Sequence, residues 1–379
     1  MKGHGPDSLS PETKISAVIL DLDGTILNTE KATESVLEEF LAKYGKEVDP
    51  GKEENRLGQM HNESAASIVK DYDLPLTASE FSKEIMPMYT ARWPNAKALP
   101  GANRLISHLH KHKIPFALAS NSKRENIGEK LSHHKGWTEL FSVILGSDQV
   151  KSGKPSPDLF LEAAKRMGVD AAHCLVIEDS LVGVRASKNA GMKVVAVPSS
   201  VRLADCYSIA DCVLHSLLEF QPELWGLPEF KDWVQNALPI EPLHVKGLLS
   251  GIPNDSSVPL SIIPDRATAV SLPDQVSGVY FGWAILSTHG IFKAVVSIGW
   301  ELRGGIANRV IQACLLGEFD KDISGEQLEL WIVGYIRQLC SEANASTAFE
   351  IFPEDKSNAE AALDLPIFSY DEDLPIFSY

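Results

Sequence analysis

Cysteine is scarce in this 379-residue chain. Its cysteines are odd in number, are scattered, and show none of the paired spacings typical of zinc ligands. A disulfide framework and a cysteine-based zinc site are therefore excluded, and we expect free thiols in a reducing compartment. The five positions are Cys174, Cys206, Cys212, Cys314 and Cys340.

Positive charge is also in short supply. Lysine and arginine number 35 against 51 acidic residues, which gives a net charge of −16 and a pI near 5.2. This balance argues against non-specific binding to nucleic acid or to an anionic membrane, so we expect neither partner. If such a protein handles an anionic substrate, a metal ion or lysine side chains must reverse the field locally.

Long hydrophobic runs are missing as well. No segment reaches the roughly 18 uninterrupted apolar residues of a membrane-spanning helix. The opening "MKGHGPDSLSPETK" has neither the apolar region of a secretion signal nor an arginine-rich amphipathic pattern. We therefore expect a soluble, cytoplasmic protein.

The length of the chain is enough for about two domains. From residue 14 to 215, short apolar runs alternate with helical patterns such as "SPDLFLEAAKRMG", which predicts a parallel α/β sheet. The expected strands are Ala17 to Leu20, Phe116 to Ala119, Val143 to Leu145, Leu175 to Ile177, Val194 to Val197 and Cys212 to Leu214.

Two segments depart from this alternation. Residues 31–98 are helical throughout, and we expect them to form a cap over the sheet edge. Runs such as "SGVYFGWAIL" and "GIFKAVVSIGW" near the C-terminus are aromatic and β-branched, which predicts a small antiparallel barrel or sheet. The expected division is a flexible N-terminus at 1–13, an α/β domain at 14–215, a linker at 216–245, a β domain at 246–363 and a tail at 364–379 that repeats "DLPIFSY".

The stretch "SAVILDLDGTILNTE" carries the first chemical signal. A buried strand ends in Asp21 and Asp23, whose side chains point the same way because side chains alternate along an extended chain. Two carboxylates so close repel each other unless a cation lies between them. Gly24 permits a sharp turn, and Thr25 offers a hydroxyl and an amide to an anion. Taken alone, however, Asp-Gly is also an ordinary turn signal.

Polar residues follow three later strands or loops in the same manner. "FALASNS" ends in Ser120 and Asn121, "KSGKPSPDLF" supplies Lys154 just before a helix, and "CLVIEDS" ends in Glu178 and Asp179. Each has an ordinary structural explanation, such as a helix cap, a solvated lysine or a charged loop. Their joint occurrence at strand ends of one sheet favours a single site that holds a cation and a phosphoryl group.

These four stretches resemble the motifs of the haloacid-dehalogenase-like (HAD) phosphatase superfamily, and residues 31–98 resemble its small α-helical cap. The resemblance implies an α/β Rossmann-like HAD fold and a phosphohydrolase that uses an aspartyl-phosphate intermediate and Mg²⁺. Asp21 is the implied nucleophile and Asp23 the implied acid and base, with Ser120 and Lys154 stabilising the phosphoryl oxygens. The implied metal ligands are Asp21, Asp23 through its carbonyl, Asp179 and Glu178, and Gly24, Thr25 and Asn121 complete the phosphate-binding set.

Over nearly its whole length the chain resembles the bifunctional FMN phosphatase/riboflavin kinase family, in which a capped HAD domain precedes a β-barrel of riboflavin-kinase type. The stretches that carry this resemblance include "WGLPEFKDWVQNALPI" and "SGVYFGWA", followed by "SIGW". FMN is the implied phosphatase substrate, with riboflavin and ATP as the ligands of the barrel. Gln59 in the expected cap stands where relatives often place a basic residue, which leaves another small phosphate ester open as substrate; Gln59 is equally read as an ordinary helix-surface residue.

The kinase-like part departs from its family in two places. The family motif Gly-x-Pro-Thr-x-Asn holds the Mg²⁺-nucleotide, but its Thr and Asn positions are Asn254 and Ser256 in one alignment and Leu260 and Ile262 in another. Gln312 occupies the place of the glutamate base, and an amide cannot accept a proton near neutral pH. We therefore expect a kinase-like fold with impaired chemistry, and a fully bifunctional enzyme or a flavin-binding barrel are the alternatives.

Overall fold

The computed structural model describes most of the chain. The described residues are 14–49, 51–52, 61–198, 206–250, 259–265, 268, 272–303, 306–317, 325–340 and 349–369. Among these residues, none of the helices combines the length and the apolar character needed to cross a membrane.

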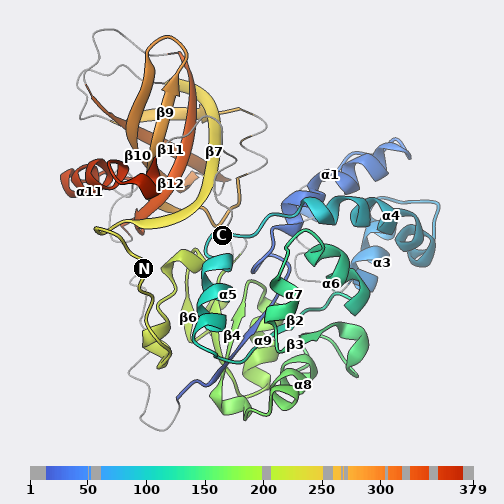
Figure 1. Cartoon of the computed structure of the whole chain (residues 1–379). Helices are drawn as coiled ribbons and strands as arrows, with labels where there is room; N and C mark the ends of the chain where they lie inside the picture. Colours follow the sequence, from blue (N-terminus) through green and yellow to red (C-terminus); the bar gives the residue numbers. More distant parts are fainter. Residues whose placement is uncertain are drawn as a thin grey trace.

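A six-stranded parallel sheet forms the first domain, in the order β3-β2-β1-β4-β5-β6 (Figure 1). All six expected strands are present, and each bound agrees with the expected one to within one residue. The central strand β1 pairs with β2 on one side and β4 on the other. The strands are β1 (Ala17–Leu20), β2 (Phe116–Ala119), β3 (Val143–Leu145), β4 (Cys174–Glu178), β5 (Lys193–Ala196) and β6 (Cys212–Val213).

Helices cover both faces of this sheet because both faces are apolar. Val18 and Leu20 pack with α5, α6 and α7, whereas Ala17 and Ile19 pack with α8 and α9. Because successive side chains of a strand point to opposite faces, the continuous apolar run of β1 contributes to two cores. The helices are α5 (Ala102–Lys111), α6 (Arg124–Leu131), α7 (Trp137–Leu140), α8 (Asp158–Met167) and α9 (Leu181–Asn189), with short 3₁₀ turns η2 (Ser147–Gln149) and η3 (Ala171–His173).

The expected cap is helical and has a core of its own. Phe40 of α1 packs edge to face on Phe81 of α4, with ring centroids 5.0 Å apart. Asn28 caps α1, and Thr77 and Glu80 form a reciprocal capping box at the start of α4. Figure 1 shows these helices grouped beside the sheet. The elements are α1 (Thr29–Ala42), α3 (His61–Asp71), α4 (Ala78–Arg92) and η1 (Trp93–Asn95).

The second domain is a closed barrel in the order β10-β11-β8-β7-β12-β9, which lies at one end of the molecule in Figure 1. Its interior is apolar, and α11 packs on its outer face through Ala359, Ala362 and Leu363. Closure removes the exposed strand edges of an open sheet. The elements are β7 (Leu238–Ser250), β8 (Leu260–Pro264), β9 (Gly278–Leu286), β10 (Gly290–Arg303), β11 (Ile306–Leu316), β12 (Gln327–Arg337), α11 (Pro353–Leu363) and η7 (Pro366–Phe368).

The expected linker at 216–245 needs correction at both ends. Its first part, with the 3₁₀ turns η5 (Leu217–Glu219) and η6 (Pro222–Trp225), packs Phe220 and Trp225 into the core of the first domain. At its other end β7 begins at Leu238, before the expected boundary. The first copy of the tail repeat packs on the barrel through the buried ring of Phe368, and residues 370–379 lie outside the described residues.

Candidate active site

The end of β1 brings Asp21 to the carboxyl edge of the sheet, where β4 ends in Glu178 and Asp179 follows it. The backbone N–H of Asp21 donates to the carbonyl of Ile177 at 3.1 Å, which fixes the two strand ends side by side. The three side chains are 6%, 0% and 4% exposed, and their carboxylate oxygens lie within 4.8 Å of one another. The predicted acidic cluster therefore exists and is buried.

Lys154 lies inside this cluster. Its Nζ is 2.5 Å from Asp21 Oδ1 and 2.6 Å from Glu178 Oε1, and its side chain is 2% exposed. Burial disfavours the charged amine, yet the two carboxylates hold the pKa of Lys154 above its ordinary value. Burial raises the pKa of Asp21 to about 7 against the opposing effect of Lys154, and Glu178 adds to the rise.

The backbone between the two aspartates and Thr25 is tightly turned. Gly24 adopts a φ of 83°, and a Cβ at this position would overlap the carboxylate of Asp179. The hydroxyl of Thr25 is 3.3 Å from Asp21 Oδ2 and 3.1 Å from Asp179 Oδ1. Gly24 and Thr25 therefore lie directly against the acidic cluster.

Asp23 faces a second set of partners. Lys130 Nζ of α6 lies 2.6 Å from its Oδ1, and the hydroxyls of Ser120 and Ser122 lie 3.3 and 3.0 Å from its Oδ2. Thr29 donates to Oδ1 at 2.8 Å. Burial alone raises the pKa of Asp23, but Lys130, Thr29 and Ser122 together outweigh this effect and hold the pKa below the usual range.

Asn121 braces the loop that carries Lys154. Its side-chain Oδ1 accepts a 2.8 Å hydrogen bond from the Lys154 N–H, and its Nδ2 donates to the Lys154 carbonyl at 3.2 Å. Asn121 thus holds the backbone of the neighbouring loop in place at Lys154. Glu178 is similarly held by the N–H and hydroxyl of Ser180, at 2.8 and 2.9 Å.

The donor set fits a divalent cation. Three converging carboxylates are hard oxygen ligands, the kind that Mg²⁺, Ca²⁺ and Mn²⁺ prefer, and the described cluster contains no cysteine or histidine. The carboxylates carry more negative charge than Lys154 neutralises, so a cation at this point is electrostatically favoured.

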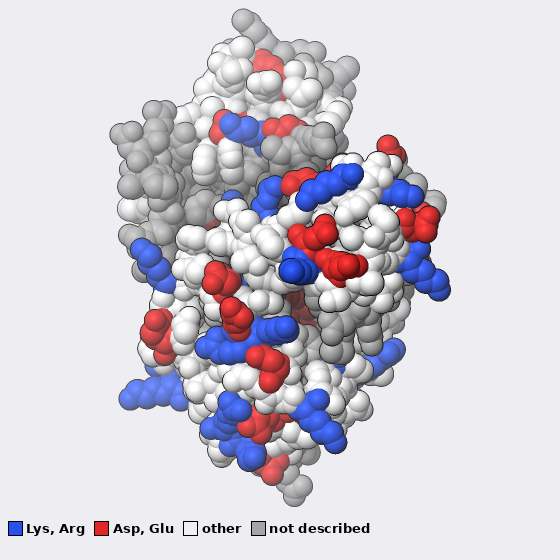
Figure 2. Space-filling model, turned by 90° about the vertical axis from the view of Figure 1, so that its right-hand side faces the viewer, with Lys and Arg blue, Asp and Glu red and all other residues white. Residues whose placement is uncertain are grey.

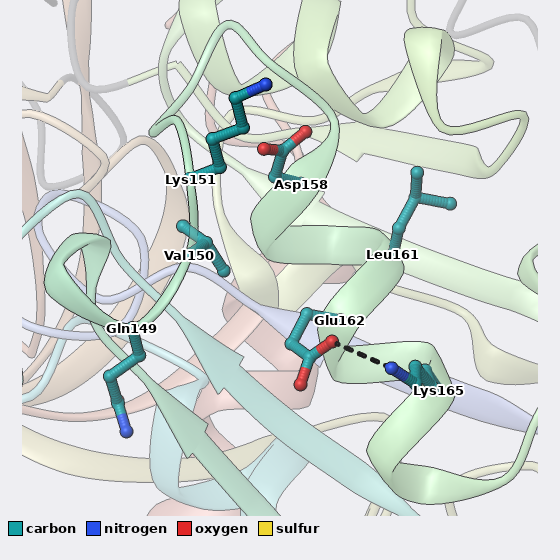
Figure 3. A pocket seen from close by; sticks show the side chains of 7 residues that line it. All are labelled: Gln149, Val150, Lys151, Asp158, Leu161, Glu162 and Lys165. Carbon is teal, nitrogen blue, oxygen red and sulfur yellow. Dashed lines mark ion pairs between the residues drawn. The ribbon is translucent and has the colours of Figure 1, made fainter.

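Two surface hollows lie apart from this cluster. One, of about 430 Å³, lies between residues 149–151 and α8, and its Glu162–Lys165 ion pair spans 3.7 Å (Figure 3). The other is a cleft of about 1800 Å³ between α5 and β7. Figure 2 shows acidic and basic side chains interspersed over the described part of one face, with neither sign forming a continuous patch.

Some of the charged residues on the walls of the cleft between the domains are paired. Arg104 makes 2.6 and 2.7 Å hydrogen bonds to Asp232, and Glu329 contacts both His244 and Lys246. Its volume also exceeds the roughly 300–1,000 Å³ of small-molecule pockets. The chemistry of the protein is therefore better sought at the acidic cluster.

In the barrel, Gln312 of β11 pairs in register with Ser297 of β10 and Ser261 of β8. The buried hydroxyl of Ser297 has no hydrogen-bond partner within the described part of the chain. Leu260 and Ile262 are buried in the barrel core. In one of the two alignments they stand at the Thr and Asn positions of the nucleotide motif. Asn254, Ser256 and the cap residue Gln59 lie outside the described residues.

Each of the two domains matches a known protein family. Residues 18–197 match the haloacid dehalogenase-like hydrolase family and residues 261–363 match the riboflavin kinase family. A (DL)-glycerol-3-phosphatase of Arabidopsis thaliana is 42% identical over 58% of this chain and 76% of its own length. A crystal structure of a HAD hydrolase from Entamoeba histolytica has a TM-score of 0.50 at 23% identity, covering 56% of this chain and 97% of that one, and shows the fold alone.

A further relative aligns with both domains at once. The bifunctional riboflavin kinase/FMN phosphatase of Arabidopsis thaliana is 47% identical over 358 residues, which covers 93% of this chain and 94% of that protein. This match extends through both domains and the segment that joins them. It agrees with the capped parallel sheet and the closed barrel of the structure. This chain is a HAD-superfamily phosphatase and belongs to the bifunctional riboflavin kinase/FMN phosphatase family.

Proposed function

We propose that this protein hydrolyses FMN to riboflavin and inorganic phosphate at the acidic cluster, with Mg²⁺ as the metal. The observation that carries the proposal is the buried group of Asp21, Glu178, Asp179 and Lys154 at the carboxyl edge of the sheet. FMN as substrate is supported by the 47% identical relative, which spans both domains. When bound, Mg²⁺ offsets the repulsion between the Asp21 carboxylate and an anionic phosphate.

The residues supply the steps of the reaction. An oxygen of Asp21 attacks phosphorus, the bond to the ester oxygen breaks, and that oxygen takes a proton from Asp23. Asp23 is a carboxylate in the free protein. The adjacent anionic phosphate favours its protonated form for this step. Water then attacks the aspartyl phosphate, gives a proton to Asp23, and releases phosphate and a free Asp21. The cationic Lys154 and the hydroxyls of Ser120 and Thr25 stabilise charge on the phosphoryl oxygens.

The barrel supports a second candidate function, which is phosphorylation of riboflavin by ATP. The match of residues 261–363 to the riboflavin kinase family favours it. The amide of Gln312 can orient the riboflavin hydroxyl but cannot take its proton. We therefore propose that the phosphatase reaction dominates and that the kinase reaction of this chain is slow.

One experiment tests the phosphatase and its metal. Purified full-length protein is incubated with FMN and Mg²⁺, and FMN and riboflavin are resolved chromatographically. We expect riboflavin from wild type, no detectable riboflavin from Asp21→Asn, and loss of activity in EDTA that Mg²⁺ restores. Asp21-dependent release from a generic aryl phosphate but not from FMN would keep the chemistry and overturn the flavin assignment.

A further inference from the structure

A segment of the barrel domain reaches residues 21–25 of the phosphatase domain, which form its catalytic loop. Gln275, which is 7% exposed, donates from Nε2 to the carbonyl of Gly24 at 3.0 Å. Gly24 lies between Asp23, the proposed acid and base, and Thr25, whose hydroxyl contacts Asp21 and Asp179 of the acidic cluster. The two partners are 251 positions apart in the sequence, so the contact exists because the domains pack together.

The barrel holds this segment rigidly. Arg309 donates from Nη1 to the Leu272 carbonyl at 3.0 Å and from Nη2 to the Pro273 carbonyl at 2.6 Å. The indole N–H of Trp300 donates to the Asp274 carbonyl at 3.0 Å. Three successive carbonyls before Gln275 are thus fixed by strands β10 and β11, which leaves the side chain of Gln275 a defined position.

The same segment touches the start of the cap. Asp274 Oδ1 lies 4.0 Å from Lys31 Nζ, in the first turn of α1. That turn also contains Thr29, which donates to Asp23. The barrel therefore contacts both ends of the short stretch that leads from the catalytic loop into the cap.

The N–H of Gly24 donates to the Leu27 carbonyl at 2.9 Å, and the hydrogen bond from Gln275 acts on the next peptide, between Gly24 and Thr25. Gly24 has no side chain and a positive φ, so its peptide can rotate more easily than that of another residue. The peptide plane fixes the Gly24 carbonyl and the Thr25 N–H in opposite directions, so a donor on the carbonyl also orients the N–H. A hydrogen bond on a carbonyl further polarises the amide and strengthens its N–H as a donor.

We infer that Gln275 is a positioning residue of the phosphatase, supplied by the kinase-like barrel, which holds the Gly24–Thr25 peptide in its working orientation. The inference rests on the proposed phosphatase site at Asp21. It assigns the barrel a part in FMN hydrolysis that does not depend on any kinase reaction.

Three variants separate hydrogen bonding from packing. Gln275→Met keeps the length of the side chain and removes the donor, and Gln275→Glu presents an acceptor to the Gly24 carbonyl. Glu241→Gln is the matched control, because Glu241 makes a different contact between the domains, with Asn103, away from the catalytic loop. Full-length proteins are compared in hydrolysis of FMN and of p-nitrophenyl phosphate, and by hydrogen exchange of peptides that span residues 21–28.

We expect Gln275→Met to lower kcat about tenfold with KM within about twofold, and Gln275→Glu to lower kcat further. Backbone exchange in residues 21–28 should speed up in both variants and stay unchanged in Glu241→Gln. Wild-type kcat and wild-type exchange in Gln275→Met would overturn the inference. Faster exchange in the variant, with no FMN hydrolysis by wild type, would support the contact while rejecting the proposed substrate.

Discussion

Asp21 and Asp23 lie two residues apart, yet their surroundings move their pKa values in opposite directions. Burial raises the pKa of Asp21 to about 7, because Lys154 is shared with Glu178. Asp23 is only partly buried, it contacts Lys130 and three hydroxyl groups, and its pKa is lowered. Each aspartate thus contacts a different lysine, Lys154 from the loop before α8 and Lys130 from α6.

Replacing Lys130 tests whether Asp23 depends on a lysine of its own site. Its side chain is 7% exposed and its Nζ offsets the charge of Asp23 beside the proposed phosphate position. In Lys130→Met we expect KM for FMN to rise about tenfold, because an uncompensated carboxylate repels the anionic substrate. Steady-state kinetics measure this, with Lys123→Met, an exposed lysine just before the same helix, as the control. An unchanged KM in Lys130→Met would contradict the assigned role.

Sequence patterns could find the residues that follow strands but not those brought in by packing. Asp21, Asp23, Ser120, Glu178 and Asp179 all come directly after apolar runs, and the structure brings their side chains together. Ser122 carried a weak signal, since it lies in the same "SNS" stretch as Ser120. Lys130 had none, because a lysine in "RENIGEKL" is typical of any solvated helix.

At the level of elements, the parallel strands were predictable because each is a short apolar run between turn signals. Strand β7 was missed because it contains Pro239 and Pro242, which cannot donate to a ladder and are typical of loops. Its pairing with β12 shifts register between Ile332 and Gly334, which accommodates an irregular strand. The barrel could therefore be expected from its later strands, while its first strand could not.

Asp211 joins helix α9 to strand β5 and allows a prediction on stability. Its carboxylate accepts from Lys188 of α9 at 2.8 Å, from Lys193 of β5 at 2.9 Å and from the Val194 N–H at 2.9 Å. Burial raises the pKa of Asp211, but these donors outweigh it and hold the pKa below 3.8. The stabilisation is therefore complete above about pH 4 and is lost as the pH falls through the folded-state pKa.

We expect Asp211→Asn to lower the free energy of unfolding by about 1–3 kcal/mol at pH 7. The difference from wild type should shrink below about pH 3.8, where the unfolded carboxyl is protonated and the folded one begins to be. Denaturant unfolding at several pH values measures both. Glu125→Gln, in the first turn of α6, is the control and should change stability by less than about 0.5 kcal/mol. Equal stability of Asp211→Asn and wild type at pH 7 would refute the prediction.

At the level of the whole molecule, the two domains match families that catalyse opposite reactions, the removal of phosphate from FMN and the phosphorylation of riboflavin. If the Asp21 site hydrolyses FMN, the product riboflavin is the substrate that a working barrel would phosphorylate. The contact between Gln275 and Gly24 joins the domains at the phosphatase site, whatever the rate of the kinase. No pattern in the sequence could indicate this contact, because neither residue is unusual in its own segment.

The kinase can be measured without interference from the phosphatase in an Asp21→Asn background, where FMN is not consumed. We expect slow FMN formation from riboflavin and Mg²⁺-ATP in Asp21→Asn, and faster formation when Gln312→Glu is added. A carboxylate at this position of β11 can take the proton of the riboflavin hydroxyl, and general base catalysis contributes about 10²–10⁴-fold. Gln327→Glu, exposed at the start of β12, is the matched control for added charge.

The size of that gain separates two causes of a slow kinase. A rise of about 100-fold would mean that the missing base at Gln312 limits the reaction and that the barrel still binds nucleotide and riboflavin. No rise would contradict the prediction and place the defect in nucleotide binding, where neither alignment restores the family motif. Because Leu260 and Ile262 are buried in the barrel core, that second defect could not be repaired there without placing polar groups in an apolar interior.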